Sequence, residues 1–462
     1  MTDTVSVDNA VNRRFALFIT TLAAFLSPFA ISSVNIALPS IGKEFLMNAI
    51  LLSWVGTAYL LATAIFLVPF GKIADLYGRK KIFTYGIMTF TVASFGSAIS
   101  NSAMMLISFR ILQGIGAAAI YCIGAAILTS LFPSKELGKV LGINVAAVYL
   151  GASFGPFLGG FLTQHLGWRS IFLVNAFPGL IIILFIFWRL KGEWREEEEK
   201  KFDLAGSIIF IVTLLLIMYG FSHLSTMLGI WLILPGALGI IAFIKWETKI
   251  ESPVLDLSLF RNNRGFALSN LATLINYSAT FAVTFLLSLY LQYIKKLTPE
   301  HAGLILIPQP IVQAFFSPLA GRLSDKIEPQ IVASAGMALT GAGLLLLAML
   351  GEKTTLGFII ASVVVLGFGF ALFSVPTINA VMRSVENRFY GVASGMLGTM
   401  RSMGMVFSMG ITILIFSIYI GDVQITPEYY PIFLRCMKLA FIFFAVLCFG
   451  GIFASLARGK VR

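Results

Sequence analysis

The feature that most constrains this chain is a series of long apolar segments, each long enough to form a membrane-crossing helix. A helix needs about 20 mostly apolar residues to span the hydrocarbon core of a bilayer. Fourteen such runs occur in the 462 residues, near 14–38, 49–70, 82–100, 103–132, 139–163, 169–190, 204–222, 226–244, 265–293, 302–320, 329–350, 354–376, 391–420 and 432–457. They are too long and too continuously apolar for the alternating strands of a membrane barrel. The sequence therefore predicts an all-α integral membrane protein with 14 transmembrane helices.

The net charge of +12 is distributed unevenly between the two sides of this predicted bundle. Most basic residues fall in alternate connections, on the side that also carries both chain ends. The opposite connections carry only Lys43, Arg169, Lys295, Lys296 and Lys353. Because lysine and arginine are retained on the cytoplasmic side of membrane proteins, we expect both termini in the cytoplasm and the protein in the cell membrane. The basic residues are thus a topology signal, and we expect no nucleic-acid partner.

Residues that carry catalytic or redox chemistry are few. The cysteines fall inside predicted helices without metal-site spacing, at Cys122, Cys436 and Cys448. The histidines fall in predicted connections, where we expect no role for them, at His165, His223 and His301. The chain has no phosphate-binding loop, no zinc-protease motif and no nucleophile elbow. We therefore expect neither an enzyme nor a self-powered pump, and no cofactor or metal.

Polar segments divide the apolar runs into groups of six, two and six. We place an N-terminal six-helix bundle in residues 1–190 and a C-terminal six-helix bundle in residues 265–462. Residues 191–264 hold cytoplasmic linkers and two extra helices. The charged stretch within this middle part is most simply a solvated linker.

The two six-helix bundles look related. Gly71 and Asp75 follow the second run, and Gly321 and Asp325 follow the tenth at the same internal spacing. Many secondary transporters are built from paired halves of this kind, with the substrate site near the midplane between them. The repeat predicts two pseudo-symmetric bundles.

The first copy of this repeat, GKIADLYGRKK, has a regular spacing of Gly, Asp, Gly and Arg that an ordinary basic loop does not require. Gly71 and Gly78 permit tight turns and close helix contacts. Asp75 can pair with Arg79 one helical turn along. Lys80 and its neighbours anchor the segment at the inner surface, so the stretch is a candidate gating motif.

The fourth run contains a positively charged residue at a position that should lie within the membrane. Arg110 lies roughly 10 Å from the outer end of this helix at 1.5 Å per residue, close to Gln113 and Gly114. A charged residue inside a membrane is a candidate functional site. The alternative is that the Arg110 side chain extends to water at the outer interface.

The fifth run carries its own helix breakers, in the stretch GASFGPFLGG. Small residues spaced by four lie on one helix face and let two membrane helices touch closely. Proline frees a carbonyl and favours a bend. The candidate motif consists of Gly151, Gly155, Pro156, Gly159 and Gly160. A purely structural helix crossing remains the alternative.

Together, these stretches resemble the major facilitator superfamily. GKIADLYGRKK is similar to its inner-loop signature, RILQGIGAA to its fourth-helix signature, and GASFGPFLGG to the fifth-helix signature of its antiporters. The fourteen runs, with WRSIFLVNAFPG at 168–179 and VNIALPSI at 34–41, resemble the fourteen-helix drug:proton antiporter branch. This resemblance implies the family's fold, alternating access, and export driven by proton entry.

The same resemblance implies that Arg110 belongs to the coupling machinery, that Asp75 helps to latch the inner side, and that the fifth-helix glycines seal the path. One position departs from the branch, because Ala30 stands where an acidic residue is expected. None of the 21 acidic residues falls deep within a run. A proton carrier needs a group whose pKa can cross the working pH, usually a buried carboxylate. Proton coupling is therefore implied by the resemblance and opposed by the residues.

A few polar side chains remain inside the runs as candidates for the substrate pathway. They are Asn35, Asn276, Tyr277, Gln309, Gln313, Asn379 and Arg401. Arg401 lies about midway along the thirteenth run, where an inward-facing role is favoured. Gln309 and Gln313 lie beside prolines and suggest a bent, cavity-lining tenth helix. For each amide, a structural hydrogen bond between helices is the alternative.

These features predict a secondary active transporter, an efflux antiporter for small amphipathic or hydrophobic compounds that works by alternating access. The alternatives are a facilitator or anion-linked exchanger without proton coupling, and a transporter-like membrane sensor. The absence of interior acids, together with two arginines, favours neutral or anionic substrates over cations. We expect a monomer whose partners are a small-molecule substrate, the lipid bilayer and a coupling ion, for which the resemblance implies a proton.

Overall fold

The computed structural model describes residues 2–189, 203–223, 226–250, 253, 263–385 and 390–458, and every regular element within them is helical. In chain order the elements are α1 (Thr2–Glu44), α2 (Ala49–Tyr77), α3 (Arg79–Ala98), α4 (Ala103–Leu131), α5 (Ser134–Leu166), α6 (Arg169–Arg189), α7 (Leu204–Ser222), α8 (Met227–Glu247), α10 (Arg264–Thr280), α11 (Ala282–Leu289), η1 (Tyr290–Ile294), α12 (Pro299–Leu306), α13 (Pro308–Lys326), α14 (Pro329–Ala348), α15 (Leu356–Arg383), α16 (Tyr390–Tyr419), η3 (Pro427–Tyr429) and α17 (Tyr430–Leu456).

Thirteen spans among the described residues are long and apolar enough to cross a bilayer. The run predicted at 82–100 corresponds to α3, which has 20 residues but includes several buried serines and threonines. These hydroxyl side chains lower its mean hydropathy, yet α3 packs inside the first bundle against α4 and α6. With α3 included, the predicted all-α fold with 14 membrane helices is confirmed.

Two of the fourteen spans are interrupted helices. The ninth consists of α10, α11 and η1, and the tenth consists of α12 and α13. The tenth breaks at Ile307, directly before Pro308. Proline lacks the N–H that would continue the helical hydrogen bonds. Ile307 keeps helical backbone angles, and the Ile311 N–H donates to its carbonyl at 3.2 Å, so a bend in the tenth span stays a prediction.

Local chemistry accounts for several helix ends. The Asn48 side chain accepts a hydrogen bond from the Leu51 N–H at 2.7 Å and so caps α2. Gly78 ends α2 with a φ of 107°, in the region that favours glycine. The chain can therefore turn from α2 directly into α3.

The two halves repeat the same helix contacts, as the sequence repeat predicts. A Cβ on Gly116 of α4 would lie 2.7 Å from the carbonyl oxygen of Gly86 in α3. A Cβ on Gly369 of α15 would lie 2.9 Å from the carbonyl oxygen of Gly336 in α14. Each half therefore contains a glycine-mediated crossing of its third and fourth helices. Between the halves, α2 packs on α16 and α5 packs on α12.

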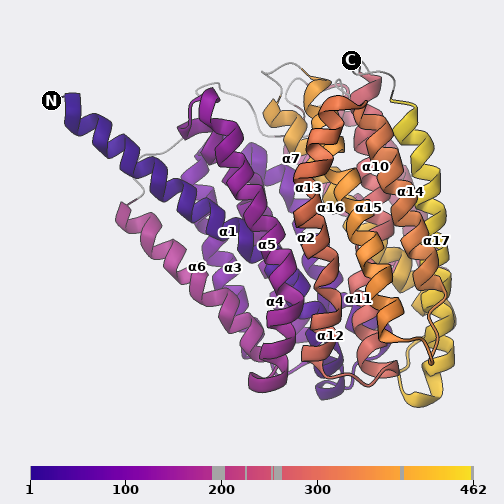
Figure 1. Cartoon of the computed structure of the whole chain (residues 1–462). Helices are drawn as coiled ribbons and strands as arrows, with labels where there is room; N and C mark the ends of the chain where they lie inside the picture. Colours follow the sequence, from indigo (N-terminus) through magenta and orange to yellow (C-terminus); the bar gives the residue numbers. More distant parts are fainter. Residues whose placement is uncertain are drawn as a thin grey trace.

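The two termini lie on the same side of the molecule (Figure 1), which we call the termini side, and we call the opposite side the far side. The extra helix α7 packs on α8, on α2 and on α16, so it covers a junction between the halves. Most of α8 is exposed. The predicted linker stretches 190–202, 251–252 and 254–262 lie outside the described residues, so the division into domains stays a prediction.

The described polar contacts between the halves are concentrated on the far side. Ser288 Oγ donates to the Asn35 carbonyl at 2.7 Å, which joins α11 to α1. His165 Nε2 and Glu300 Oε2 lie 3.1 Å apart, which joins α5 to α12. In Figure 1 the ribbons of α1 and α6 slant away from the second half toward the termini side. These polar contacts hold the two halves together mainly on the far side.

Candidate functional site

The glycine motif of α5 forms a close seam with α1. A Cβ on Gly151 would collide with a main-chain carbonyl of α1, and one on Gly159 would lie 2.7 Å from Ser33 Cα. Gly155 lies directly against the Ser32 side chain. Main chain cannot move aside as a flexible side chain can, so α1 and α5 approach this closely only because these positions have no side chain.

The same motif also reaches the other half of the molecule. A Cβ on Gly160 would collide with the carbonyl of Pro299, and one on Gly303 would collide with the carbonyl of Pro156. Both Pro299 and Gly303 belong to α12. The seam therefore joins three helices, and α5 is the element that contacts α1 in its own half and α12 across the molecular midline.

Arg110 is fully buried in α4. Its Nε donates to the Val55 carbonyl at 3.0 Å, and its Nη1 donates to Gln113 Oε1 at 2.5 Å. The guanidinium lies 4.3 Å from the ring centroid of Tyr59, and Gln113 in turn donates to Ser94 Oγ at 2.7 Å. The alternative in which Arg110 extends to water is therefore wrong, because α2, α3 and α4 enclose the side chain.

Among the described residues of the second half, no network corresponds to that of Arg110. Gly114 of α4 touches a main-chain carbonyl of α2, and Gly367 of α15 touches the carbonyl of Gln309 in α13. Four residues before each glycine stand Arg110 in α4 and Val363 in α15. The two halves share the glycine contact between helices, but a charged residue precedes it only in α4 and an apolar one in α15. This difference indicates that Arg110 is more than a packing residue.

The predicted gating motif lies at the termini-side end of α2. Asp75 Oδ1 and Arg79 Nη2 are 2.8 Å apart, as their spacing predicts. Arg79 Nη1 also donates to Ser130 Oγ at the end of α4. A Cβ on Gly71 would lie 2.9 Å from Cys122 Sγ of α4, and Lys80 lies in the first turn of α3. The motif thus ties the ends of α2, α3 and α4 together.

The repeated motif makes the corresponding tie in the second half. Asp325 Oδ1 accepts a hydrogen bond from Arg383 Nη2 at 2.7 Å, which joins α13 to α15. Gly321 packs against α15 as well. Asn379 Nδ2 donates to Ser324 Oγ at 2.8 Å. Asn379, a candidate for the substrate pathway, therefore takes part in this contact between helices.

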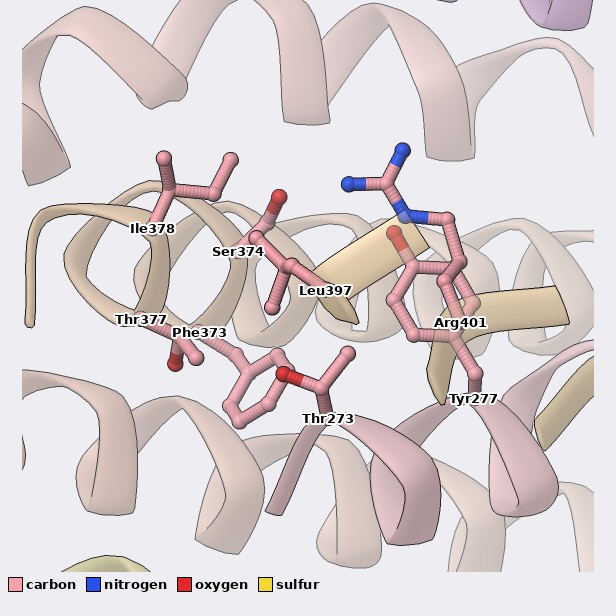
Figure 2. Close-up of a pocket in the computed structure, with 8 residues that line it drawn as sticks. All are labelled: Thr273, Tyr277, Phe373, Ser374, Thr377, Ile378, Leu397 and Arg401. Atoms are coloured by element: carbon pink, nitrogen blue, oxygen red, sulfur yellow. The ribbon is translucent and has the colours of Figure 1, made fainter. Parts of the chain in front are cut away.

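Near the middle of the bundle, side chains from both halves meet around Arg401 of α16. The Arg401 guanidinium lies 5.3 Å from the ring centroid of Tyr277 of α10 (Figure 2). Tyr121 of α4 and Tyr149 of α5 also lie near it. Tyr149 and Ser374 of α15 share a hydrogen bond of 2.9 Å between the halves. One cation is thus surrounded by phenol groups from three helices, α4, α5 and α10.

A small pocket opens beside this cation. Its lining consists of Thr273, Tyr277, Phe373, Ser374, Thr377, Ile378, Leu397 and Arg401 (Figure 2). These side chains come from α10, α15 and α16 of the second half. The lining combines hydroxyl groups, aromatic rings and one positive charge around a cavity of about 10 Å³, which in this conformation has room for about one water molecule.

The other candidate amides occupy different surroundings. Asn276 is fully buried in α10, and neither polar atom of its side chain has a hydrogen-bond partner. Asn35 lies in the far-side contact with α11. Gln309 and Gln313 lie in the first turns of α13, after the break, with Gln313 buried. The predicted pathway residues therefore do not form one cluster, and only Tyr277 and Arg401 line the central pocket together.

Carboxylates are absent from the interior of the described spans. Each described acidic side chain lies within about one turn of a helix end or in a connection. Asp203 and Glu247 are buried, but at the termini-side ends of α7 and α8. Trp246 Nε1 donates to Asp203 Oδ2 at 3.1 Å. The described structure thus agrees with the sequence-based expectation that no acid lies near the midplane.

Some site residues were missed by reasoning from the sequence. Tyr121, Tyr149 and Ser374 come from three helices, and nothing in their local sequence distinguishes them from packing residues. His165, for which no role was expected, contacts Glu300 across the halves. Only the arrangement of the helices brings these side chains to the midline or to the far-side contact.

Fourteen membrane helices in two related halves, with polar side chains of both halves meeting near the midplane, define a membrane transporter. Comparison with known families identifies which one. The Major Facilitator Superfamily model matches residues 20–251 and 270–460. The chain belongs to this superfamily of membrane transporters and is not an enzyme.

Relatives of known name cover most of the chain. The riboflavin transporter RibZ of Clostridioides difficile is 32% identical over 394 residues, which is 85% of this chain and 86% of that protein. The multidrug resistance protein Stp of Mycobacterium tuberculosis is 32% identical over 380 residues, covering 80% and 70%. A bacterial homologue of the human lysosomal transporter Spinster, solved in an inward-facing conformation, superimposes with a TM-score of 0.70 at 16% identity over 97% of both chains.

Proposed function

We propose that this protein is an efflux carrier that moves small amphipathic or hydrophobic molecules by alternating access. The observation that carries this proposal is the α5 seam, in which one glycine-rich helix packs on both α1 and α12. In transporters built from two repeats, alternating access is largely a rigid-body rocking of one bundle against the other around a central site. The names of the multidrug resistance and riboflavin relatives support a small organic substrate.

We propose the fourteen-helix antiporter branch as the place of this chain within the superfamily. Its support is the order of the three signature stretches and the enclosed Arg110–Gln113 pair, for which the resemblance implies a role in coupling. We also propose that the protein is a monomer in the plasma membrane, with both termini in the cytoplasm. An antiporter of this branch exchanges its substrate for a proton.

A second candidate is a facilitator or anion-linked exchanger without proton coupling. One specific observation favours it, because no described carboxylate lies in the interior of a membrane span. Arginine does not release its proton in proteins, so neither Arg110 nor Arg401 replaces the missing acid. The two candidates share the transport path and differ in the exchanged partner.

Counterflow in proteoliposomes tests the proposal. Purified protein is reconstituted into vesicles loaded with riboflavin, and the entry of labelled riboflavin is measured. A pH-sensitive dye in the lumen reports luminal pH in the same experiment. A lipophilic cationic dye is tested in parallel as a second substrate. Exchange of either compound supports a carrier, and saturable binding without exchange identifies a sensor instead. Luminal pH that changes in step with net substrate movement supports the proton antiporter, and constant pH supports the second candidate.

A further inference from the structure

Arg401 differs from Arg110 in what surrounds its charge. Arg110 is fully buried, stacks on Tyr59, and uses its Nε and Nη1 in hydrogen bonds within the first half. Arg401 lines the pocket beside Ser374, and its Nε, like Nη2 of Arg110, is buried with no hydrogen-bond partner. The first arginine is enclosed by its own half, whereas the second presents its charge to a pocket.

The position of Arg401 is that of a shared central site. Tyr121, Tyr149, Tyr277 and Arg401 lie about 15 to 23 Å from the termini-side ends of their helices at 1.5 Å per residue. Two of these tyrosines come from the first half, and the third comes from the second half with Arg401. A ligand held here touches both halves, so its binding depends on their relative position.

The charge of Arg401 has no counter-ion in the described interior. The guanidinium stays protonated at any physiological pH. Aromatic rings attract a cation, but they do not neutralise it. An unpaired charge in a low-dielectric site is costly, and a bound anion would offset that cost. The same charge repels a cationic ligand.

We propose that Arg401 and its tyrosines form the recognition site for small aromatic molecules that carry one anionic group, such as a carboxylate. This inference rests on the proposed transport function and names its substrate class. The anionic group pairs with the Arg401 guanidinium, and the aromatic body stacks among the tyrosine rings. The Tyr149–Ser374 hydrogen bond crosses the site, so the ligand takes its place when the halves separate around it.

Three matched naphthalene probes test this class by charge alone: labelled 2-naphthoate, 2-naphthalenemethanol and 2-naphthylmethylamine. Equilibrium binding is measured on the purified full chain at pH 7.5, with Arg401→Gln and Arg401→Lys as variants. Arg435→Gln is the matched control, because Arg435 lies 5.5 Å from the Tyr419 ring but is exposed. Melting temperature and elution volume check that each variant is folded.

We expect 2-naphthoate to bind at least tenfold more tightly than the alcohol or the ammonium. Arg401→Gln should lower the affinity for 2-naphthoate at least tenfold, and its affinity for the alcohol should stay within threefold of that of the parent. Arg401→Lys keeps the charge but loses the planar fork of the guanidinium. Its affinity for 2-naphthoate should therefore lie between those of the parent and Arg401→Gln. Arg435→Gln binds all three probes as the parent does.

Three results would overturn the inference: a cation bound as tightly as 2-naphthoate, unchanged 2-naphthoate affinity in Arg401→Gln, or no binding of any probe. Riboflavin counterflow is measured on the same preparations. Counterflow without a preference for the anion overturns the substrate class and leaves the transport proposal standing. Binding of 2-naphthoate at Arg401 without counterflow of any compound overturns transport and leaves the anion site standing.

Discussion

At the scale of single residues, two arginines inside the bundle show how surroundings decide what a buried charge does. Arg110 sits among a carbonyl, an amide and an aromatic ring, so its direction is set by three contacts at once. The described contact of the Arg401 guanidinium is with the face of the Tyr277 ring. We therefore expect Arg110 to be sensitive to the shape of the cation and Arg401 to its charge.

Arg110→Lys should reduce the initial rate of riboflavin counterflow at least tenfold. Lysine keeps the charge, but its ammonium is a point donor that cannot both bridge Val55 and Gln113 and stack on Tyr59. Arg435→Lys, at the exposed arginine of α17, should leave the rate unchanged. A counterflow rate of Arg110→Lys equal to that of the parent would show that only the positive charge matters at this position.

At the scale of elements, α5 offers glycines with opposite surroundings in one helix. A Cβ on Gly142 would have nothing within 4 Å, whereas a Cβ on Gly159 would lie 2.7 Å from Ser33 main-chain atoms. Alanine within a helix is normally more stable than glycine by roughly 0.5–1 kcal/mol. Overpacking against a fixed backbone typically costs about 1–3 kcal/mol. The two effects have opposite signs, so the two positions separate them.

Gly142→Ala should therefore raise the melting temperature of the purified protein, and Gly159→Ala should lower it. Both variants add one methyl group to α5, which makes each the control for the other. If Gly159→Ala melts at or above the parent temperature, the α1–α5 seam is looser than the structure indicates.

The far-side contact between α5 and α12 gives a second prediction at this scale. In a cysteine-free background, His165→Cys with Glu300→Cys places one thiol on each half. A short bismaleimide joining them should reduce counterflow at least fivefold, because the far side can no longer open. A control pair, Glu44→Cys with Arg169→Cys, replaces a 2.6 Å ion pair within the first half. Its cross-linking should leave counterflow intact, and equal inhibition by both pairs would contradict the role given to α5 and α12.

At the scale of the whole molecule, the charge asymmetry predicts which face is cytoplasmic. Lys326 is exposed on the termini side, and Lys353 is exposed on the far side. In intact cells, a membrane-impermeant maleimide should label Lys353→Cys and not Lys326→Cys. Permeabilised cells should show both. Labelling of Lys326→Cys alone in intact cells would reverse the proposed orientation.

Most of the architecture was predictable because its signals are local and repeated. A membrane span is a property of about 20 consecutive residues, so the helices could be located without tertiary information. Among the described spans, α3 alone, with its buried hydroxyl side chains, gives a weak hydropathy signal. The Asp75–Arg79 pair was predictable for the same reason, since its partners lie one turn apart.

The central site was predictable only in part. Arg401 and Tyr277 stood out as polar groups in apolar runs, yet Tyr121, Tyr149 and Ser374 gave no such signal because a tyrosine or serine is ordinary in a membrane helix. Which face of each helix points inward is set by packing against three or more neighbours. That information is spread over the whole chain rather than held in any one segment.

The sequence by itself determined the membrane class, the fourteen spans, the repeat of two halves and the absence of interior acids, because each follows from residue type and spacing. The tertiary structure decided that the GASFGPFLGG stretch packs on α1 and α12 at once, and that Arg110 is enclosed while Arg401 lines a pocket. The physical reason is that backbone-to-backbone approach and the pairing of a buried charge depend on distances between residues far apart in the chain.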